Sequence, residues 1–259
     1  MARATMIGSN DCMVGASCLR LSLKNSDGEM RLIPAHIENL LQALLSDRTS
    51  RLIVLEGITG SFCEGVDLNR LSQQLGEKTD AVGLAHFAQL LAAIGQVPQP
   101  VIALVDGQAM GGGVGLAAAA DLVLASSKAS FALPETVMGM IPAMVFPYIA
   151  RRIGVPKARL MALGTKPLSA EAAFRIGLVD EVVDDLEGAY KRYARRFARM
   201  EPRAIGTMKT LIATHFTTPE NYQIDAANRF HELLASQATR VRLKRFAVGQ
   251  SPWTEESQQ

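Results

Sequence analysis

Four glycines crowd into five positions near the middle of the chain, at 111, 112, 113 and 115. They follow the strand-like run at 100–107 and lead into a helix candidate at 114–120. Glycine lets the main chain approach a ligand closely, and a helix N-terminus adds exposed N–H groups with positive partial charge. The lysine and Ser/Thr of a GxxxxGK[ST] phosphate loop are absent, which favours an oxyanion as the ligand. A tight helix–strand contact that only needs small side chains stays open as the alternative.

A second loop, GSFCEGVDL at 60–68, follows another buried-strand candidate, RLIVLEG at 51–57. Ligands of open α/β sheets bind at the carboxyl ends of the strands, so we expect this loop and the glycine run to face a common ligand. Two converging N–H groups would stabilise the negative charge that develops on a thioester carbonyl oxygen.

The third stretch is FALPETVMGMIP at 131–142, in which Glu135 has mostly apolar neighbours. Burial among apolar side chains raises the pKa of a carboxyl group, which suits proton transfer near neutral pH. The alternative is an ordinary exposed loop glutamate.

The elements that must position these residues alternate between strand and helix, with a helical tail from about residue 184. The pattern predicts an α/β fold with a core domain over 14–195, a C-terminal helical region over 196–250 and loose termini at 1–13 and 251–259. Strands are predicted at 17–24, 51–57, 100–107, 122–126, 130–133 and 178–183, and helices at 36–46, 84–97, 114–120, 150–164 and 169–178. The polar stretch at 73–83 reads as a mobile flap.

Composition narrows the function classes. The net charge is +2, from 27 basic and 25 acidic residues, so the composition does not show the excess of basic residues that is typical of nucleic-acid-binding proteins. The three cysteines at 12, 18 and 63 form no metal-ligand spacing, and reduced thiols favour the cytoplasm. No apolar run approaches the ~18 residues of a membrane span, and no secretory signal is expected at the N-terminus. No metal or redox cofactor is implied.

These stretches together resemble the crotonase (enoyl-CoA hydratase/isomerase) superfamily. The resemblance rests on five segments that follow one another from about residue 51 to 183: GSFCEGVDL, PVIALVDGQAMGGGVGLAAAADLVLAS, SFALPETVMGMIP, ARRIGVPKARLMALG and LSAEAAFRIGLVDEVV. It implies a spiral of ββα units and a C-terminal helical region that mediates trimers, often paired into hexamers.

The resemblance also assigns roles to single residues. The N–H groups of Val66 and Gly112 would form the oxyanion hole, and Glu135 would transfer the proton. Asp67, Leu68 and Gly111 would border the substrate beside them. The acyl group would be carried on phosphopantetheine or coenzyme A.

One departure from the family pattern is informative. Hydratases of the family usually carry a second glutamate two residues beyond the glycine triplet, where this chain has Gly115. A single acid leaves room for a branched acyl group. The combination of GGGVG, the P-E element and GMIPAMVFPYIARRIG resembles more narrowly the dehydratases of polyketide β-branching. These enzymes remove water from 3-hydroxy-3-methylglutaryl on an acyl carrier protein, giving 3-methylglutaconyl. The junction LKNSDGEMRLIP also departs from the hydratase pattern and leaves the carrier open.

Two other functions remain open, an isomerase acting on acyl-CoA and a non-catalytic binder of acyl thioesters or carrier proteins. His86 could assist Glu135, and His231 is a weaker candidate. We expect Cys63 to be a packed small side chain rather than a nucleophile, and Asp121 to be structural. A basic cluster reads as a solvated face, or alternatively as a docking surface for an acidic carrier protein or nucleotide phosphates; it comprises Arg151, Arg152, Lys157 and Arg159.

Overall fold

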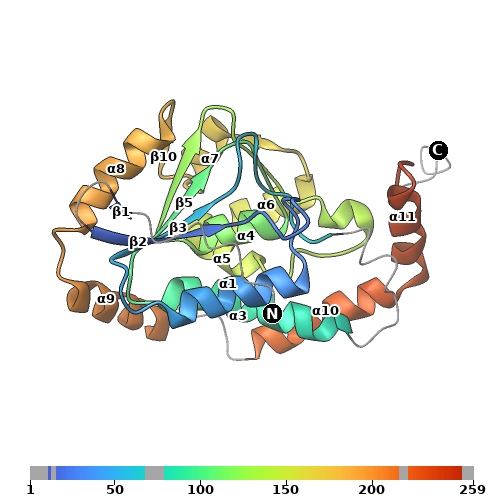
Figure 1. Cartoon of the computed structure of the whole chain (residues 1–259). Helices are drawn as coiled ribbons and strands as arrows, with labels where there is room; N and C mark the ends of the chain where they lie inside the picture. Colours follow the sequence, from blue (N-terminus) through green and yellow to red (C-terminus); the bar gives the residue numbers. More distant parts are fainter. Residues whose placement is uncertain (1–10, 13–15, 68–78, 216–220, 253–259) are drawn as a thin grey trace.

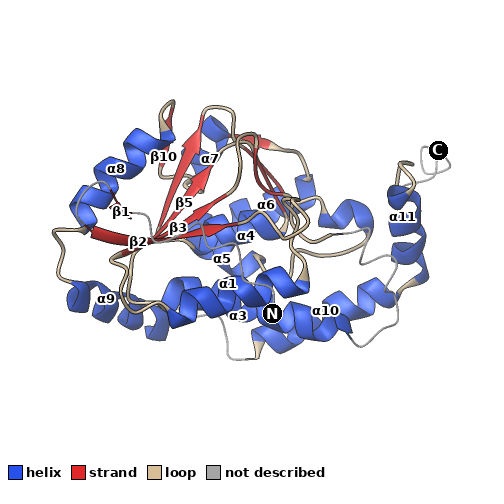
Figure 2. Cartoon of the chain, viewed as in Figure 1, coloured by secondary structure: helices blue, strands red, loops and turns tan. Residues whose placement is uncertain are grey.

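The computed structural model describes residues 11–12, 16–67, 79–215 and 221–252, and its strands fan out between layers of helices (Figure 1, Figure 2). The strands form two sheets. In order across the larger sheet they are β1 (Asp11–Cys12), β2 (Ala16–Ser22), β3 (Leu52–Glu56), β5 (Val101–Val105), β7 (Leu122–Ser126) and β10 (Glu181–Val183). The smaller sheet has the order β4 (Ser61–Cys63), β6 (Gln108–Met110), β8 (Ser130–Ala132) and β9 (Leu168–Ser169).

The chain climbs as a spiral of repeated units. The successive pairs β3–β4, β5–β6 and β7–β8 each give one strand to each sheet, and the strands of one sheet pair in parallel with those of the next unit. Helices follow these pairs: α3 (Thr79–Gln96), α4 (Gly112–Ala119), and the 3-10 helix η1 (Glu135–Met138) with α5 (Phe146–Ile153). The predicted α/β spiral of ββα units is therefore confirmed.

The remaining helices cover the sheets and extend the chain. They are α1 (Pro34–Ser46), α6 (Val155–Gly164), α7 (Ala170–Ile176), α8 (Leu186–Phe197), α9 (Pro202–His215), α10 (Tyr222–Ala235) and α11 (Gln237–Ala247). Helix α3 contacts both α1 and α10, and these three lie along one side of the sheets. Helix α8 lies on the opposite side, and α11 stands at the far end of the molecule (Figure 1).

Burial explains why the central strands form where the sequence predicts them. Every residue of β5 is buried, as are four of the five in β3. A parallel strand covered on both faces needs a continuous apolar run, which VIALV and LIVLE supply. Ser169 caps α7 by accepting a hydrogen bond from the Ala172 N–H, as its position predicts.

Some sequence-based boundaries were wrong. The single helix predicted over 150–164 is two helices that meet at Gly154, whose φ of +80° interrupts the helical backbone. Strands β4 and β6 fall in segments predicted as loops, because three residues are too short for a periodicity to show. Part of the predicted flap is helical from Thr79 onward. Residues 68–78 and most of the predicted loose termini lie outside the described residues.

Asp121 is structural, as predicted, and ties α9 to the sheet. Its Oδ2 accepts hydrogen bonds from the Val101 N–H (2.7 Å) and from Lys209 Nζ (2.5 Å). The Lys209 side chain is only 4% exposed and also donates to the Ile94 and Gln99 carbonyls, at 3.2 and 2.9 Å. Because all its donors are matched, the buried ammonium is stabilised where it lies.

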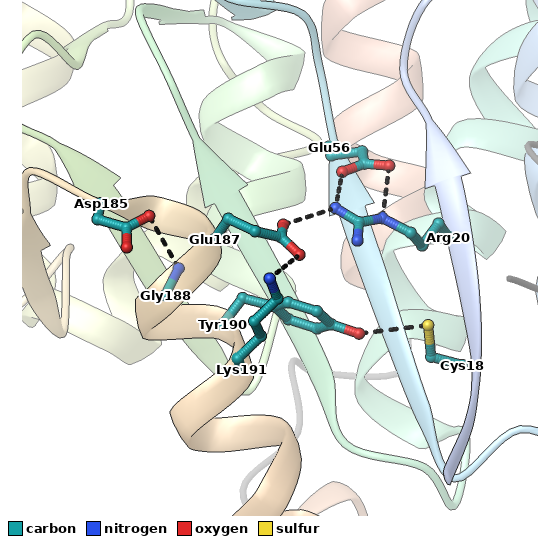
Figure 3. Close-up of polar contacts among 8 residues, drawn as sticks. All are labelled: Cys18, Arg20, Glu56, Asp185, Glu187, Gly188, Tyr190 and Lys191. Atoms are coloured by element: carbon teal, nitrogen blue, oxygen red, sulfur yellow. Dashed lines mark hydrogen bonds and ion pairs between the residues drawn. The ribbon is translucent and has the colours of Figure 1, made fainter. Parts of the chain in front are cut away.

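Helix α8 is attached to the sheet by a second polar cluster (Figure 3). Arg20 of β2 pairs with Glu56 of β3 through two hydrogen bonds of 2.9 and 2.6 Å and reaches Glu187 of α8 at 3.4 Å. Its guanidinium lies 5.0 Å from the centre of the Tyr190 ring, and Tyr190 donates to Cys18 Sγ. These contacts join two strands to a helix, so the cluster has a structural role.

Within the described residues, no helix is long and apolar enough to cross a membrane. The same residues contain no group of three or more His, Cys, Asp or Glu side chains arranged to hold a metal ion.

Removing the buried cation should destabilise the fold. Lys209→Ala leaves Asp121 without its charged partner, and we expect a loss of about 2–4 kcal/mol in the free energy of unfolding. Lys191→Ala is the matched control, because Lys191 forms a surface i,i+4 pair with Glu187 that is worth ~0.5 kcal/mol. Urea unfolding of both variants measures the difference, and equal losses would contradict the assignment.

Candidate active site

The two loops singled out in the sequence lie against each other. Strands β4 and β6, which lead into them, pair in parallel with Cys63 beside Ala109. A Cβ on Gly65 would lie 3.3 Å from the Gly112 nitrogen, and a Cβ on Gly113 would overlap the Cys63 carbonyl. Glycine is therefore required on both loops for the backbones to approach this closely.

The backbone around Val66 is set by a short parallel bridge to the segment before α1. The Leu32 N–H donates to the Gly65 carbonyl at 2.7 Å, and the Asp67 N–H donates to the Leu32 carbonyl at 3.4 Å. Successive N–H groups of an extended chain point to opposite sides, so the Val66 N–H points away from Leu32.

Gly112 is the first residue of α4. An N–H group in the first turn has no acceptor within its own helix, and it lies at the positive end of the helix dipole. The preceding Gly111 has φ +50° and ψ −111°, and its own N–H donates to the Ala132 carbonyl of β8 at 2.9 Å. Gly111 is thus anchored to the smaller sheet, and the Gly112 N–H lies in the first turn of α4, where it has no helical acceptor.

Glu135 enters the same place from the end of β8 as the first residue of η1. Its carboxylate lies against the glycine turn, since a Cβ on Gly111 would come within 2.9 Å of Glu135 Oε1. The other oxygen, Oε2, is buried without a hydrogen-bond partner in the described part of the chain. Burial raises the pKa of the Glu135 carboxyl to about 7, against a small opposing effect of its own backbone N–H.

A cavity of about 80 Å³ joins these groups. Its described lining is mostly apolar and includes two ionisable side chains, Glu135 and Glu64. The described lining residues come from five parts of the chain: Glu64, Gly65 and Val66; Leu84 and Phe87 of α3; Gly111 and Gly112; Pro134, Glu135, Met138 and Met140–Val145; and Phe230 of α10. The site can hold an apolar group beside these carboxyl groups and the backbone of two turns.

Four of the predicted site residues therefore meet at one cavity: Val66, Gly111, Gly112 and Glu135. Asp67 is absent from the described lining; its side chain lies 4.0 Å from Arg31. Leu68 lies outside the described residues. The catalytic and binding roles of all six stay predictions.

The histidine and cysteine candidates are absent from the described lining of the cavity. His86 is half-buried on α3, but its neighbours Leu84 and Phe87 line the cavity in its place. His231 packs edge-on to Phe230, a lining residue, and its buried Nε2 has no partner among the described residues. Burial raises the pKa of the Cys63 thiol to about 12, which supports the prediction of a packed, unreactive side chain.

The basic cluster on α5 and α6 was only partly a solvated face. Arg152 points inward, donating to the Leu178 and Ala120 carbonyls at 2.9 and 3.0 Å and pairing with Asp180. Arg151, Lys157 and Arg159 are exposed, as expected.

Sequence reasoning missed the far wall of the cavity. Three methionines follow Glu135 closely, Met138, Met140 and Met144, and all three line the cavity. Their recurrence is a local signal from which an apolar pocket could have been predicted. Phe230 comes from α10, almost a hundred residues later, and no local pattern links it to the acid.

Comparison with known proteins agrees with this geometry. The family model for enoyl-CoA hydratase/isomerase matches residues 16–256. The chain belongs to the enoyl-CoA hydratase/isomerase family.

Bacillaene synthase dehydratase PksH of Bacillus subtilis is 29% identical over 224 residues, covering 85% of this chain and 86% of PksH. The 1,2-epoxyphenylacetyl-CoA isomerase of Escherichia coli is 29% identical over 225 residues, covering 84% and 86%. A crystal structure from Bacillus subtilis, named for a polyketide biosynthesis enoyl-CoA hydratase (pksH), superposes with a TM-score of 0.84 at 25% identity, covering 92% of this chain and 95% of the other.

In this enoyl-CoA hydratase/isomerase chain, Val145 occupies the space next to Gly115, where the sequence analysis places the second acid of the family's hydratases. A Cβ on Gly115 would lie 2.7 Å from Val145 Cβ and overlap Val145 Cγ1. Val145 is buried, is the N-cap residue of α5 and lines the cavity, and it covers Gly115. A side chain at 115 therefore has no room unless Val145 moves, and Glu135 is the acid beside the glycine turn. The expectation that Gly115 itself leaves room for a branched acyl group was wrong, because Val145 fills that volume.

The packing of Val145 on Gly115 can be measured as a coupling energy. Gly115→Ala should cost about 1–3 kcal/mol of stability through overpacking, and Val145→Ala in the same chain should relieve most of that cost. Gly95→Ala in α3 is the control, since nothing lies within 4 Å of its Cβ position, and it should be neutral or stabilising by up to ~1 kcal/mol. Additive effects of the Gly115 and Val145 changes would contradict the contact.

Burial of Glu135 should appear in the pH dependence of stability. The pKa of its carboxyl rises from 4.5 to about 7 on folding, so between these pH values the folded chain keeps a proton that the unfolded chain releases. The free energy of unfolding therefore falls as pH rises through this window. Glu135→Gln removes the effect and should be more stable than the parent at pH 8, by up to on the order of 3 kcal/mol, but close to it at pH 5. Urea unfolding at both pH values tests this, and a gap independent of pH would refute it.

Proposed function

We propose that this chain dehydrates a 3-hydroxyacyl thioester through an enolate. The observation that carries the proposal is a buried carboxyl, Glu135, with a pKa of about 7, held against a glycine turn whose Gly112 N–H has no helical acceptor. Val66 lines the same cavity, with its N–H directed away from its neighbouring strand. A base near its pKa at neutral pH beside two main-chain donors suits removal of a proton next to a thioester carbonyl.

In this mechanism the thioester oxygen accepts hydrogen bonds from the Val66 and Gly112 N–H groups. Glu135 removes a proton from the α-carbon, and the electron pair of the broken C–H bond forms the enolate. When the enolate collapses, the α–β double bond forms, the bond from the β-carbon to its hydroxyl breaks, and Glu135 returns the proton to the departing oxygen as water. One carboxyl is sufficient because it ends the cycle in the ionised form in which it began.

For the acyl group we propose 3-hydroxy-3-methylglutaryl, with 3-methylglutaconyl as the product. Its β-carbon carries a methyl group in addition to the hydroxyl, and the apolar Val145 wall fills the volume where a second acid would stand. The isopropyl side chain of Val145 packs favourably against a methyl group of the substrate. A carboxylate side chain in the same place would not, because it would lose its hydration. The likeness to PksH, a dehydratase by name, supports the same choice.

For the carrier we propose an acyl carrier protein, with the acyl group on phosphopantetheine. This also rests on the likeness to PksH and to the crystal structure named for polyketide biosynthesis. A homotrimer or hexamer remains a prediction from the family resemblance.

Isomerisation of an acyl-CoA double bond is the second candidate. A single carboxyl that removes and returns a proton is sufficient for it, and the chain is 29% identical to an isomerase of Escherichia coli. The two candidates differ in whether water is lost.

Mass spectrometry of an acyl carrier protein loaded with 3-hydroxy-3-methylglutaryl tests the proposal. We expect loss of one water, with kcat rising with pH through about 7 as Glu135 ionises. Glu135→Gln should lower kcat by roughly 10²–10⁴-fold. Glu171→Gln, which changes an exposed glutamate in the first turn of α7, should behave as the parent chain.

The same assay separates the alternatives. Turnover of 3-enoyl-CoA without loss of water from any 3-hydroxyacyl thioester would favour the isomerase. Binding of every thioester without turnover would leave a non-catalytic binder.

A further inference from the structure

The last helix of the described chain reaches the turn that carries the acid. Helix α11 stands apart from the sheets in Figure 1, yet it packs on η1, the 3-10 helix that begins with Glu135. The contact joins segments about one hundred residues apart.

Two side chains of α11 bind carbonyl groups of this turn. Arg242 Nη1 donates to the Val137 carbonyl at 2.8 Å, and Thr239 Oγ1 donates to the Gly139 carbonyl at 3.0 Å. A 3-10 helix of four residues leaves the carbonyls at its C-terminal end without internal partners. The two side chains supply those partners from outside.

The fit around Gly139 is close. Gly139 has φ +81°, and a Cβ there would lie 2.7 Å from Thr239 Oγ1 and 3.5 Å from Arg242 Cδ. Thr239 is 1% exposed, so its hydroxyl has no solvent alternative.

An apolar cluster backs the same contact. Leu243 of α11 packs with Met138 and Met140, together with Phe230 and Leu234 of α10. Both methionines and Phe230 also line the cavity. Helices α10 and α11 therefore hold η1 through both polar and apolar contacts.

The carboxylate of Glu135 depends on this support. Its Oε2 has no hydrogen-bond partner among the described residues, so the backbone of η1 sets where the carboxyl lies. We propose that Thr239 and Arg242 are positioning residues for Glu135, fixing η1 so that the carboxyl stays dry and aimed into the cavity. The proposal rests on the proposed role of Glu135 in proton transfer.

The charges around Glu135 make Thr239 the cleaner probe. Among the described residues, Glu64 lines the cavity, Arg242 binds the Val137 carbonyl and His231 packs on Phe230. The other ionisable side chains of α11 that are exposed are Arg240 and Lys244, and α6, which also contacts η1, carries the exposed Lys157 and Arg159. Replacing Arg242 removes a charge as well as a hydrogen bond, so its effects on η1 cannot be read from the hydrogen bond alone. Water entering beside a loosened η1 lowers the pKa of the Glu135 carboxyl, because burial is what raises it. Thr239→Val keeps shape and charge and removes only the hydroxyl.

The experiment compares Thr239→Val with Thr239→Ser, which retains the donor. We expect Thr239→Val to lower kcat by roughly 10- to 100-fold with KM within about threefold of the parent, because a misplaced carboxyl costs rate and not binding. The midpoint of its pH–kcat profile should move to lower pH. Thr239→Ser and the exposed Lys244→Ala should match the parent, and Arg242→Ala should lose kcat like Thr239→Val.

A readout independent of turnover separates this proposal from the proposed function. Infrared titration of the Glu135 carboxyl, with Glu135→Gln as the blank, should show the midpoint near 7 in the parent falling in Thr239→Val. If the parent dehydrates no thioester, the proposed function fails while this titration still tests the positioning. An unchanged midpoint and kcat in Thr239→Val, even with a lowered melting temperature, would overturn the positioning role.

Discussion

The close approach of two backbones is the constraint on which the site depends. Gly65 and Gly113 each lie where a Cβ would meet the opposite loop, and the pairing of β4 with β6 holds the loops in that register. Main-chain N–H groups can converge only if no side chain separates them. The spiral provides the register, because consecutive units place equivalent turns one above the other at the carboxyl ends of parallel strands.

The second constraint is the cost of burying an acid. Glu135 lies in an apolar wall, and one of its carboxyl oxygens has no hydrogen-bond partner among the residues that the structure describes. The raised pKa of its carboxyl is the measure of that cost. A carboxyl in such a place is stable only when the surrounding packing is stable without it. The apolar cluster of Met138, Met140 and Leu243 meets that condition from the C-terminal side. The contacts that stabilise η1 are thus also the contacts that surround the Glu135 carboxyl.

The contact between Gly115 and Val145 shows how packing limits which side chains can lie beside the cavity. A missing side chain on α4 is matched by an apolar one at the start of α5, so the loss of a polar position leaves no void. Val145 is anchored at the helix start, with its carbonyl accepting from the Tyr148 and Ile149 N–H groups. The wall is therefore rigid, and it presents methyl groups to whatever occupies the cavity.

The sequence alone determined the buried parallel strands, the glycine turn and the apolar setting of Glu135, because these depend on residues that are neighbours in the chain. Continuous runs such as VIALV can be buried in few ways, and glycines before an alanine-rich stretch mark a helix start. Only the tertiary structure decided that Val145 covers Gly115, that Phe230 closes the cavity and that Thr239 and Arg242 bind the turn of the acid. These contacts join segments 30 to over 100 residues apart, and no local periodicity encodes which of many apolar or polar side chains will meet once the spiral closes.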